Sequence, residues 1–215
     1  MGTTVLWGAC AAAAWLWPWA AVAPAGLWVL LVNFFRDPER VAPEGEEKLV
    51  SPADGVVADV ETVWDDEFLH GEALRIGIFM SVFDVHVNRA PVSGKVVFLS
   101  YRRGRFRNAM GAAAARENEC SLVGLERADG SRVLVRQVAG LIARRIVTTC
   151  AMGESLHRGQ RFGMVKFGSR LEVWVPASLL FRPAVAVGQR VRAGESVLGE
   201  CGLASAQGEG AGESL

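Results

Sequence analysis

The chain has 215 residues, which is enough for one large domain or for a domain with an additional segment. Its 23 basic and 23 acidic side chains balance, and this neutrality argues against a general nucleic-acid-binding protein. The four cysteines are scattered without a CxxC pair, and the three histidines form no HExxH or HxH cluster, so the sequence predicts no metal site. We interpret the cysteines as free thiols in a reducing compartment.

The first 35 residues carry no charged side chain, although they hold five of the seven tryptophans. This stretch is longer than the roughly 20 apolar residues that a membrane-spanning helix needs, but Pro18 and Pro24 interrupt it. We therefore expect residues 1–35 to form a membrane anchor. It is built either as one tilted, kinked span or as two short segments in a shallow hairpin.

Two other interpretations of residues 1–35 are weaker. A buried helix of a soluble domain rarely runs this long without a charge. A cleaved signal peptide normally has a basic leading region, which is missing. Arg36 and Arg40 follow the apolar run and favour a cytoplasmic remainder. We expect a protein of the cell membrane whose catalytic domain lies on the cytoplasmic side.

Beyond the anchor, the composition changes twice more. Residues 36–48 are polar with two prolines and indicate a linker, residues 49–201 alternate short apolar runs with Gly, Pro and Asp, and the Gly- and Glu-rich residues 202–215 are predicted to be disordered. Residues 137–146 are expected to hold at least one helical turn. The predicted strands, which are rich in Val, Ile, Leu and Phe, are Gly55–Val63, Ala73–Phe79, Val92–Ser100, Cys120–Leu125, Arg132–Val138, Gly163–Phe167, Leu171–Val175 and Arg190–Glu200.

This pattern predicts a mainly β domain, an antiparallel sandwich or barrel with few short helices. Three segments, at residues 51–57, 90–97 and 187–199, each place a turn before a valine-rich strand. Their style resembles the turns of biotinyl/lipoyl-type β sandwiches, although Pro and Gly mark hairpins in any β protein.

The pair Gly168-Ser169 lies between two strand-like runs and suggests a bond that the chain can cut itself. The serine oxygen can attack the preceding carbonyl, and glycine tolerates the backbone strain that this approach requires. Serine is a weak nucleophile, so a nearby base is needed. His86 is the best candidate because imidazole titrates near neutral pH, and Asp54 or Asp84 is available to orient it.

With these residues in view, the chain resembles the phosphatidylserine decarboxylase proenzymes of the short prokaryotic type. The resemblance implies self-cleavage between Gly168 and Ser169 into a β chain, 1–168, and an α chain, 169–215, with Ser169 converted into a covalent pyruvoyl cofactor. Asp54 matches the aspartate of the family's processing triad. The segments that carry the resemblance are Ser51–Gly55, Phe83–Gly94, Arg107–Ala109, Glu117–Glu119 and Gly163–Pro176.

Asp84 and His86 match a second Asp-x-His motif of the family. The longer bacterial enzymes have another histidine three residues after the first, where this chain has Arg89. We therefore assign both processing and decarboxylation to His86.

The resemblance also implies the reaction. The pyruvoyl carbonyl forms a Schiff base with the amine of phosphatidylserine, CO₂ leaves, and reprotonation gives phosphatidylethanolamine. The implied partners are phosphatidylserine, membrane lipid, and the α and β chains as a heterodimer, with no nucleic acid. A basic loop supplies the predicted substrate-binding residues Arg102, Arg103, Arg105, Arg107 and Asn108.

Two alternatives remain open from the residues alone. A Ser-Lys hydrolase would use Ser169 with Lys166, but residues three apart on a strand face opposite sides. A membrane-tethered, non-catalytic β sandwich acting as a carrier or assembly protein would keep an intact chain.

Overall fold

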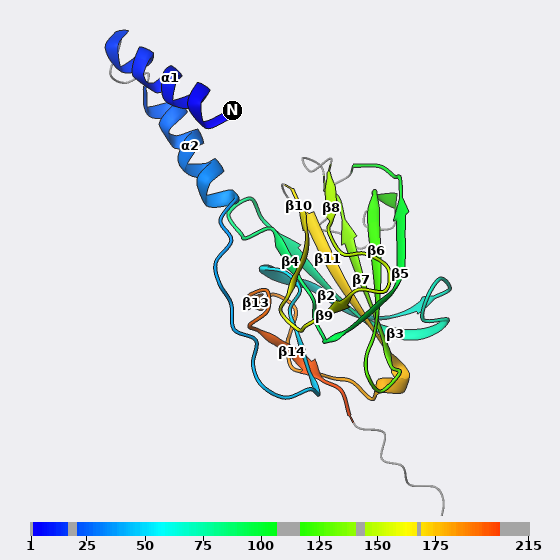
Figure 1. The fold of residues 1–215 in the computed structure, drawn as a ribbon. Helices are drawn as coiled ribbons and strands as arrows, with labels where there is room; N and C mark the ends of the chain where they lie inside the picture. Colours follow the sequence, from blue (N-terminus) through cyan, green and yellow to red (C-terminus); the bar gives the residue numbers. More distant parts are fainter. Residues whose placement is uncertain (1, 17–20, 107–116, 141–144, 167–168, 203–215) are drawn as a thin grey trace, which may run out of the picture.

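The computed structural model describes the chain except residues 1, 17–20, 107–116, 141–144, 167–168 and 203–215. Two helices, α1 (Gly2–Leu16) and α2 (Val22–Phe34), pack against each other through the rings of Trp7 and Trp28, whose centroids are 5.1 Å apart. They project from one end of a β domain, and the last described residues lie at the other end (Figure 1).

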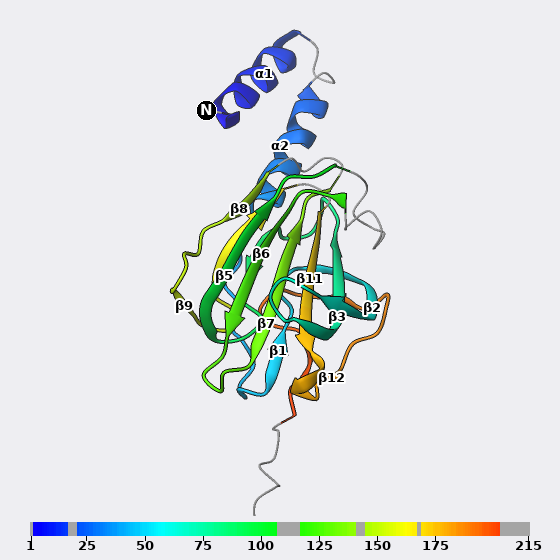
Figure 2. The same ribbon diagram turned by 90° about the vertical axis from the view of Figure 1, so that its right-hand side faces the viewer.

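The β domain is built around one large antiparallel sheet, whose strands are spread across the view in Figure 2 from β9 on one side to β2 on the other. Its strand order is β13-β2-β3-β11-β7-β6-β5-β9, so β11 lies between β3 and β7. The strands are β2 (Gly55–Asp65), β3 (Gly71–Met80), β5 (Gly94–Arg102), β6 (Cys120–Glu126), β7 (Arg132–Val138), β9 (Ser155–Leu156), β11 (Ser169–Pro176) and β13 (Arg190–Val191).

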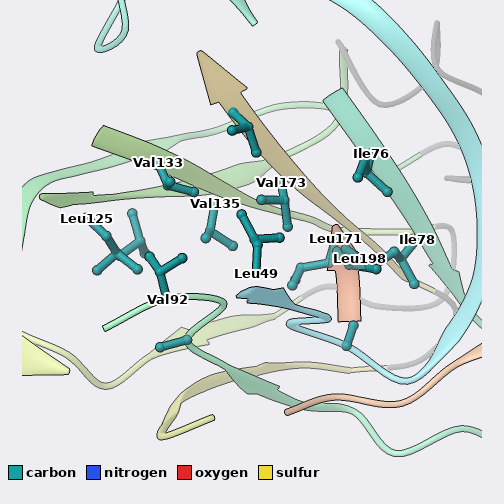
Figure 3. Packing of buried hydrophobic residues seen from close by; sticks show 14 of the residues in the cluster. Leu49, Ile76, Ile78, Val92, Leu125, Val133, Val135, Leu171, Val173 and Leu198 are labelled. Carbon is teal, nitrogen blue, oxygen red and sulfur yellow. The ribbon is translucent and has the colours of Figure 1, made fainter. Parts of the chain in front are cut away.

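Two small sheets face the large one. One has the order β4-β10-β8, formed by Val87–Arg89, Arg161–Val165 and Ile146–Thr148. The other has the order β1-β14-β12, formed by Lys48–Val50, Val197–Glu200 and Arg182–Pro183, and a short 3₁₀ helix, η2 (Ala177–Leu179), follows β11. Figure 3 shows the core between the layers. There Val135 and Val173 of the large sheet point toward Leu49 and Leu198 of the small β1-β14-β12 sheet.

Nearly every residue of strand β11 is buried, because both faces of the strand pack against other parts of the protein. Leu171, Val173 and Val175 pack in the main core, because alternate residues of a strand share a face. On the opposite face Trp174 joins a second apolar cluster with Phe68, which comes from the turn between β2 and β3.

The same opposite face carries buried charges. Arg170 and Glu172 are fully buried and paired through Nε and Oε1 at 2.8 Å. Arg170 also lies 2.6 Å from a carboxylate oxygen of Asp59, and Arg75 pairs with Asp59 at 3.2 Å. Buried charges of this kind are stable only when paired.

The expected antiparallel, mainly β architecture is confirmed, and each strand predicted between Gly55 and Val175 has a counterpart. One local prediction is wrong: residues 190–200 form two short strands separated by a turn in which Gly194 has φ +74°. The helical turn expected within residues 137–146 stays a prediction, because Gln137 and Val138 end β7, Ile146 begins β8, and residues 141–144 between them lie outside the described residues. Apart from β13, which lies inside the predicted strand 190–200, the strands of two or three residues were not predicted, because such short runs show no periodicity.

Residues 1–35 form two helices rather than one continuous span. Neither of them, nor any other helix in the described parts of the chain, is long and apolar enough to cross a membrane. The expected linker, 36–48, has no helix or strand before Lys48, and it runs along the side of the β domain toward β1 (Figure 1). Arginine side chains hold it there: Arg158 donates to the carbonyl oxygens of Pro43 and Gly45.

Candidate active site

Ser169 is the first residue of β11 and lies directly opposite Met80 of β3. Its side chain is fully buried, and its Oγ has no hydrogen-bond partner among the described residues. A buried hydroxyl without a partner is costly and is a common feature of functional positions. Gly168, the other half of the expected cleavage site, lies outside the described residues.

His86 lies between β3 and β4 and is also fully buried. Its Nδ1 is 2.9 Å from the backbone carbonyl oxygen of Asp84. A carbonyl oxygen only accepts hydrogen bonds, so the neutral ring carries its proton on Nδ1 and leaves the lone pair on Nε2. Within the described part of the chain, Nε2 has no hydrogen-bond partner. This is the tautomer that a general base requires.

The last turn of α2 covers His86. The Phe34 ring is fully buried, and its centroid lies 4.2 Å from that of the imidazole. Burial lowers the pKa of His86 below 6.5, while the hydrogen bond to the Asp84 carbonyl and the carboxylate charges of Asp84 and Asp54 oppose this shift. His86 is therefore neutral at neutral pH.

The carboxylates of Asp54 and Asp84 do not orient the imidazole by hydrogen bonds in the described structure. Asp84 Oδ2 accepts the N–H and the O–H of Ser81, and its Oδ1 accepts Arg190 Nη1 at 2.9 Å. Asp54 accepts the N–H of Ala193 at 2.7 Å and Arg40 Nη2 at 3.0 Å. The orienting oxygen is the Asp84 carbonyl, which sequence reasoning cannot distinguish from the side chain.

These two carboxylates connect segments from both sides of residue 168. Asp54 and Asp84 precede the Gly168-Ser169 pair, whereas Arg190 and Ala193 follow it. Arg40 adds a third link of this kind, because it binds both Asp54 and Glu195 at 3.0 Å. The site is therefore assembled from parts of the chain that a cut at 168/169 would separate.

Comparison with known proteins finds relatives over most of the chain. The sequence model of the phosphatidylserine decarboxylase family matches residues 28–199. The chain is 50% identical over 177 residues to the phosphatidylserine decarboxylase proenzyme of Symbiobacterium thermophilum, covering 81% of this chain and 80% of the relative.

The proenzyme of Syntrophus aciditrophicus is 46% identical over 84% of both chains, and that of Ralstonia nicotianae is 46% identical over 92% of this chain and 88% of the relative. The chain belongs to the phosphatidylserine decarboxylase family.

Arg89 lies three residues after His86, the position noted in the sequence as departing from the longer enzymes. The guanidinium of Arg89 binds the Asp37 carboxylate at 3.2 Å and the carbonyl oxygens of Pro38 and Gly159. Arg89 therefore fastens the 36–48 segment to the β domain.

The basic loop predicted to bind substrate is only partly described. Arg102 pairs with Glu67 at 2.9 Å, Arg105 lies 3.4 Å from Glu117, and Arg103 is exposed. Arg107 and Asn108 lie outside the described residues. Two of the described arginines thus already have acidic partners.

Lys166 does not favour the Ser-Lys alternative. Its ammonium lies 5.6 Å from the ring centroid of Phe35, as in a cation–π contact. Among the described residues, no group of three His, Cys, Asp or Glu side chains is arranged to hold a metal ion.

Sequence reasoning missed three buried residues near the site: Phe34, Asn88 and Gln137. Phe34 was assigned to the anchor because it belongs to the uncharged stretch. Asn88 and Gln137 are polar residues inside otherwise apolar strands, and that irregularity was the available signal.

Proposed function

We propose that this chain decarboxylates phosphatidylserine to phosphatidylethanolamine with a pyruvoyl group that it makes from its own Ser169. Membership in a family of decarboxylase proenzymes supports this function. The observation that carries the assignment to this residue is that Ser169 Oγ is buried without a hydrogen-bond partner among the described residues, as is His86 Nε2.

Self-cleavage would begin at Ser169 Oγ. The oxygen attacks the carbonyl carbon of residue 168 while His86 Nε2 takes the hydroxyl proton and passes it to the departing nitrogen. The peptide C–N bond breaks, which leaves an ester between the two parts and a free amine on residue 169. Loss of the α proton of residue 169 then breaks the ester C–O bond, freeing a carboxylate on the β chain and leaving dehydroalanine on the α chain. Water converts this group into the pyruvoyl form with release of ammonia.

The residues around position 169 suit such a group. The pyruvoyl carbonyl would condense with the substrate amine and draw electrons from the bond to the carboxylate. Burial of Ser169 and His86 limits the access of bulk water to the carbanion that forms when CO₂ leaves. His86 can return a proton to the α carbon of the product after CO₂ has left.

The two fragments would remain together as a heterodimer. After a cut at 168/169, β11 belongs to the α chain, but both of its neighbours in the sheet, β3 and β7, belong to the β chain. The ion pair between Arg190 and Asp84 would also become a contact between chains.

We further propose that residues 1–35 dock the site on the membrane as a shallow hairpin, with the β domain on the cytoplasmic side. Helices of 15 and 13 residues are only about 22 Å and 20 Å long, less than the ~30 Å hydrocarbon core. Their exposed side chains include Trp7, Trp15 and Val29. Because Phe34 contacts His86, the hairpin would hold the site beside its lipid substrate.

Mass spectrometry of the purified protein tests the central step. We expect two fragments that separate between residues 168 and 169, with a pyruvoyl group blocking the amino terminus of the smaller one. Ser169→Ala should give a single uncut chain without decarboxylase activity, whereas Ser178→Ala, at an exposed serine, should be processed like the wild type. A fully processed Ser169→Ala protein would exclude this serine as the nucleophile.

A further inference from the structure

A chain of buried polar side chains crosses the interior next to Ser169, and the mechanism above does not use it. Gln137 Nε2 donates to Asn88 Oδ1 at 2.8 Å, and Thr148 Oγ1 donates to Gln137 Oε1 at 2.8 Å. The hydroxyl groups of Thr148 and Ser121 are 2.9 Å apart. Asn88 and Gln137 are both fully buried. Polar groups this deep in a β core need a structural or functional reason.

The strand register places this polar chain beside Ser169. Gln137 of β7 lies directly opposite Leu171 of β11. Ser169 is two residues before Leu171 and shares its face, so Gln137 and Ser169 are diagonal neighbours about 7–8 Å apart. Met80 lies directly opposite Ser169 on the other side, and its sulfur is 4.0 Å from Asn88 Nδ2.

The hydrogen bonds are consistent with one orientation of the Asn88 amide. A thioether sulfur can accept a hydrogen bond but cannot donate one, so the amide group facing Met80 is the NH₂. The amide oxygen of Asn88 then faces Gln137 Nε2, as the 2.8 Å contact requires. Thr148 in turn donates to Gln137, and Ser121 donates to Thr148, so every member of the chain has one consistent role.

The Asn88 NH₂ group is therefore a donor with little to bind. Among the described residues its hydrogen-bond partner is the Met80 sulfur, at the long distance of 4.0 Å. Sulfur is a weak acceptor, and this group has two hydrogens to donate. A fully buried donor in this position is ready to bind an oxygen atom brought in beside residue 169.

We propose that Asn88 Nδ2 binds the carboxylate of the phosphatidylserine head group and that Gln137 is a positioning residue that fixes the Asn88 amide. This inference rests on the proposed function. A neutral amide suits a carboxylate that must leave as CO₂, because a cation would stabilise the charge that the reaction removes. Arg40 and Arg190, which lie near Asp54 and Asp84, are already bound to those carboxylates.

The test compares two lipids that differ in this carboxylate. Processed protein is incubated with cyanoborohydride and detergent micelles of either phosphatidylserine or phosphatidylethanolamine, and mass spectrometry measures how much lipid amine becomes attached to the small fragment. Asn88→Asp keeps the side-chain shape and still accepts from Gln137, but it has no NH₂ group. We expect this variant and Asn88→Ala to be processed, to attach at least tenfold less phosphatidylserine than the wild type, and to attach phosphatidylethanolamine normally.

Gln137→Glu tests the positioning role. The introduced carboxylate accepts hydrogen bonds and cannot donate them, so the Asn88 amide should turn its NH₂ away from the site. We expect the same selective loss of phosphatidylserine attachment, together with a higher KM and a smaller change in kcat. The matched control is Ser121→Ala, which removes the far end of the polar chain and should leave the ratio between the two lipids unchanged.

Three results would overturn the inference: wild-type attachment of phosphatidylserine in the Asn88 variants, an equal loss of both lipids, or Asn88 variants that remain uncut. The second result would point to a structural role and the third to a role in cleavage. If the wild-type protein itself is uncut or attaches neither lipid, the proposed function fails first, and the Asn88 inference fails with it.

Discussion

At the scale of single residues, a backbone carbonyl decides how His86 is set. The Asp84 carbonyl holds the proton on Nδ1, and the burial of the ring by Phe34 keeps the imidazole neutral. The Asp84 carboxylate binds Arg190 instead. His86 is thus prepared as a base by geometry and desolvation rather than by a buried acid partner.

This arrangement predicts the pH dependence of self-cleavage. Since burial lowers the pKa of His86 below 6.5, the cleavage rate should stay level as the pH falls to 6.5 and should decline only at lower pH. His86→Ala should slow cleavage by about 100-fold or more. The rate is measured as the loss of full-length chain on a gel, with His157→Ala, at an exposed histidine, as the control. An acid midpoint above 6.5 would contradict the assignment.

The same shift has a consequence for stability. Below pH 6.5 the unfolded chain binds a proton at His86 before the folded chain does, so the unfolded state is favoured. His86 should therefore contribute stability above pH 6.5 and lose it as the pH falls through the window beneath that value. The uncleavable Ser169→Ala chain allows this to be measured in one piece, by chemical denaturation at several pH values.

At the scale of elements, the end of α2 is part of the catalytic domain. Phe34 is fully buried against His86, whereas its neighbour Phe35 is 49% exposed. Arg36, just after the helix, donates to the carbonyl oxygen of Phe83 at 2.8 Å and so ties the helix end to the loop that carries Asp84 and His86. Composition places the boundary between anchor and domain after residue 35, but the packed contact between Phe34 and His86 crosses this boundary.

The two phenylalanines provide a matched test of this contact. Phe34→Ala should expose the imidazole to water, raise the pKa of His86 toward 6.5, and move the acid midpoint of self-cleavage upward. Loss of a buried Phe should also cost about 3 kcal/mol of stability. Phe35→Ala should change neither. Identical pH profiles for Phe34→Ala and the wild type would show that α2 does not control the environment of His86.

At the scale of the whole molecule, side-chain contacts place the apolar helices and the 36–48 segment relative to the site. The helices project from the end of the β domain where Phe34 meets His86 (Figure 1). Arg40 of the 36–48 segment binds Asp54 of the β domain, and Arg89 of the β domain binds Asp37 of the segment, so two ion pairs keep the segment against the surface. A membrane attached to the helices would thus be held at a fixed place relative to the site.

Charges on the exposed face of α2 should weaken this attachment. Val29 and Val32 are 58% and 50% exposed, so replacing both with lysine leaves the folded core intact. Each charge opposes insertion by up to about 3 kcal/mol, and we expect at least a tenfold loss of flotation with phosphatidylserine-containing vesicles. Val41→Lys, at a valine that is 86% exposed beside the β domain, is the control. Equal flotation of all three proteins would show that α2 does not contact lipid.

Much of the fold could be predicted from the alternation of short apolar runs. Strands such as β3 and β7 are long enough to be recognised as runs of strand-forming residues, and the lack of charge before Arg36 predicts a separate apolar element. The short strands β4 and β8 were missed, because two or three residues carry no periodic signal and form only when β10 lies between them.

The chemistry of the candidate site was visible in the order of residues, because a Gly-Ser bond, an imidazole and a family pattern are properties of local sequence. The tertiary structure decided what each group touches. It set a carbonyl oxygen rather than a carboxylate against the His86 ring, and it paired Asp54 and Asp84 with residues that follow the expected cut. It also brought Asn88 and Gln137 beside Ser169. These contacts depend on strand register and on pairing between distant segments, which a linear pattern does not specify.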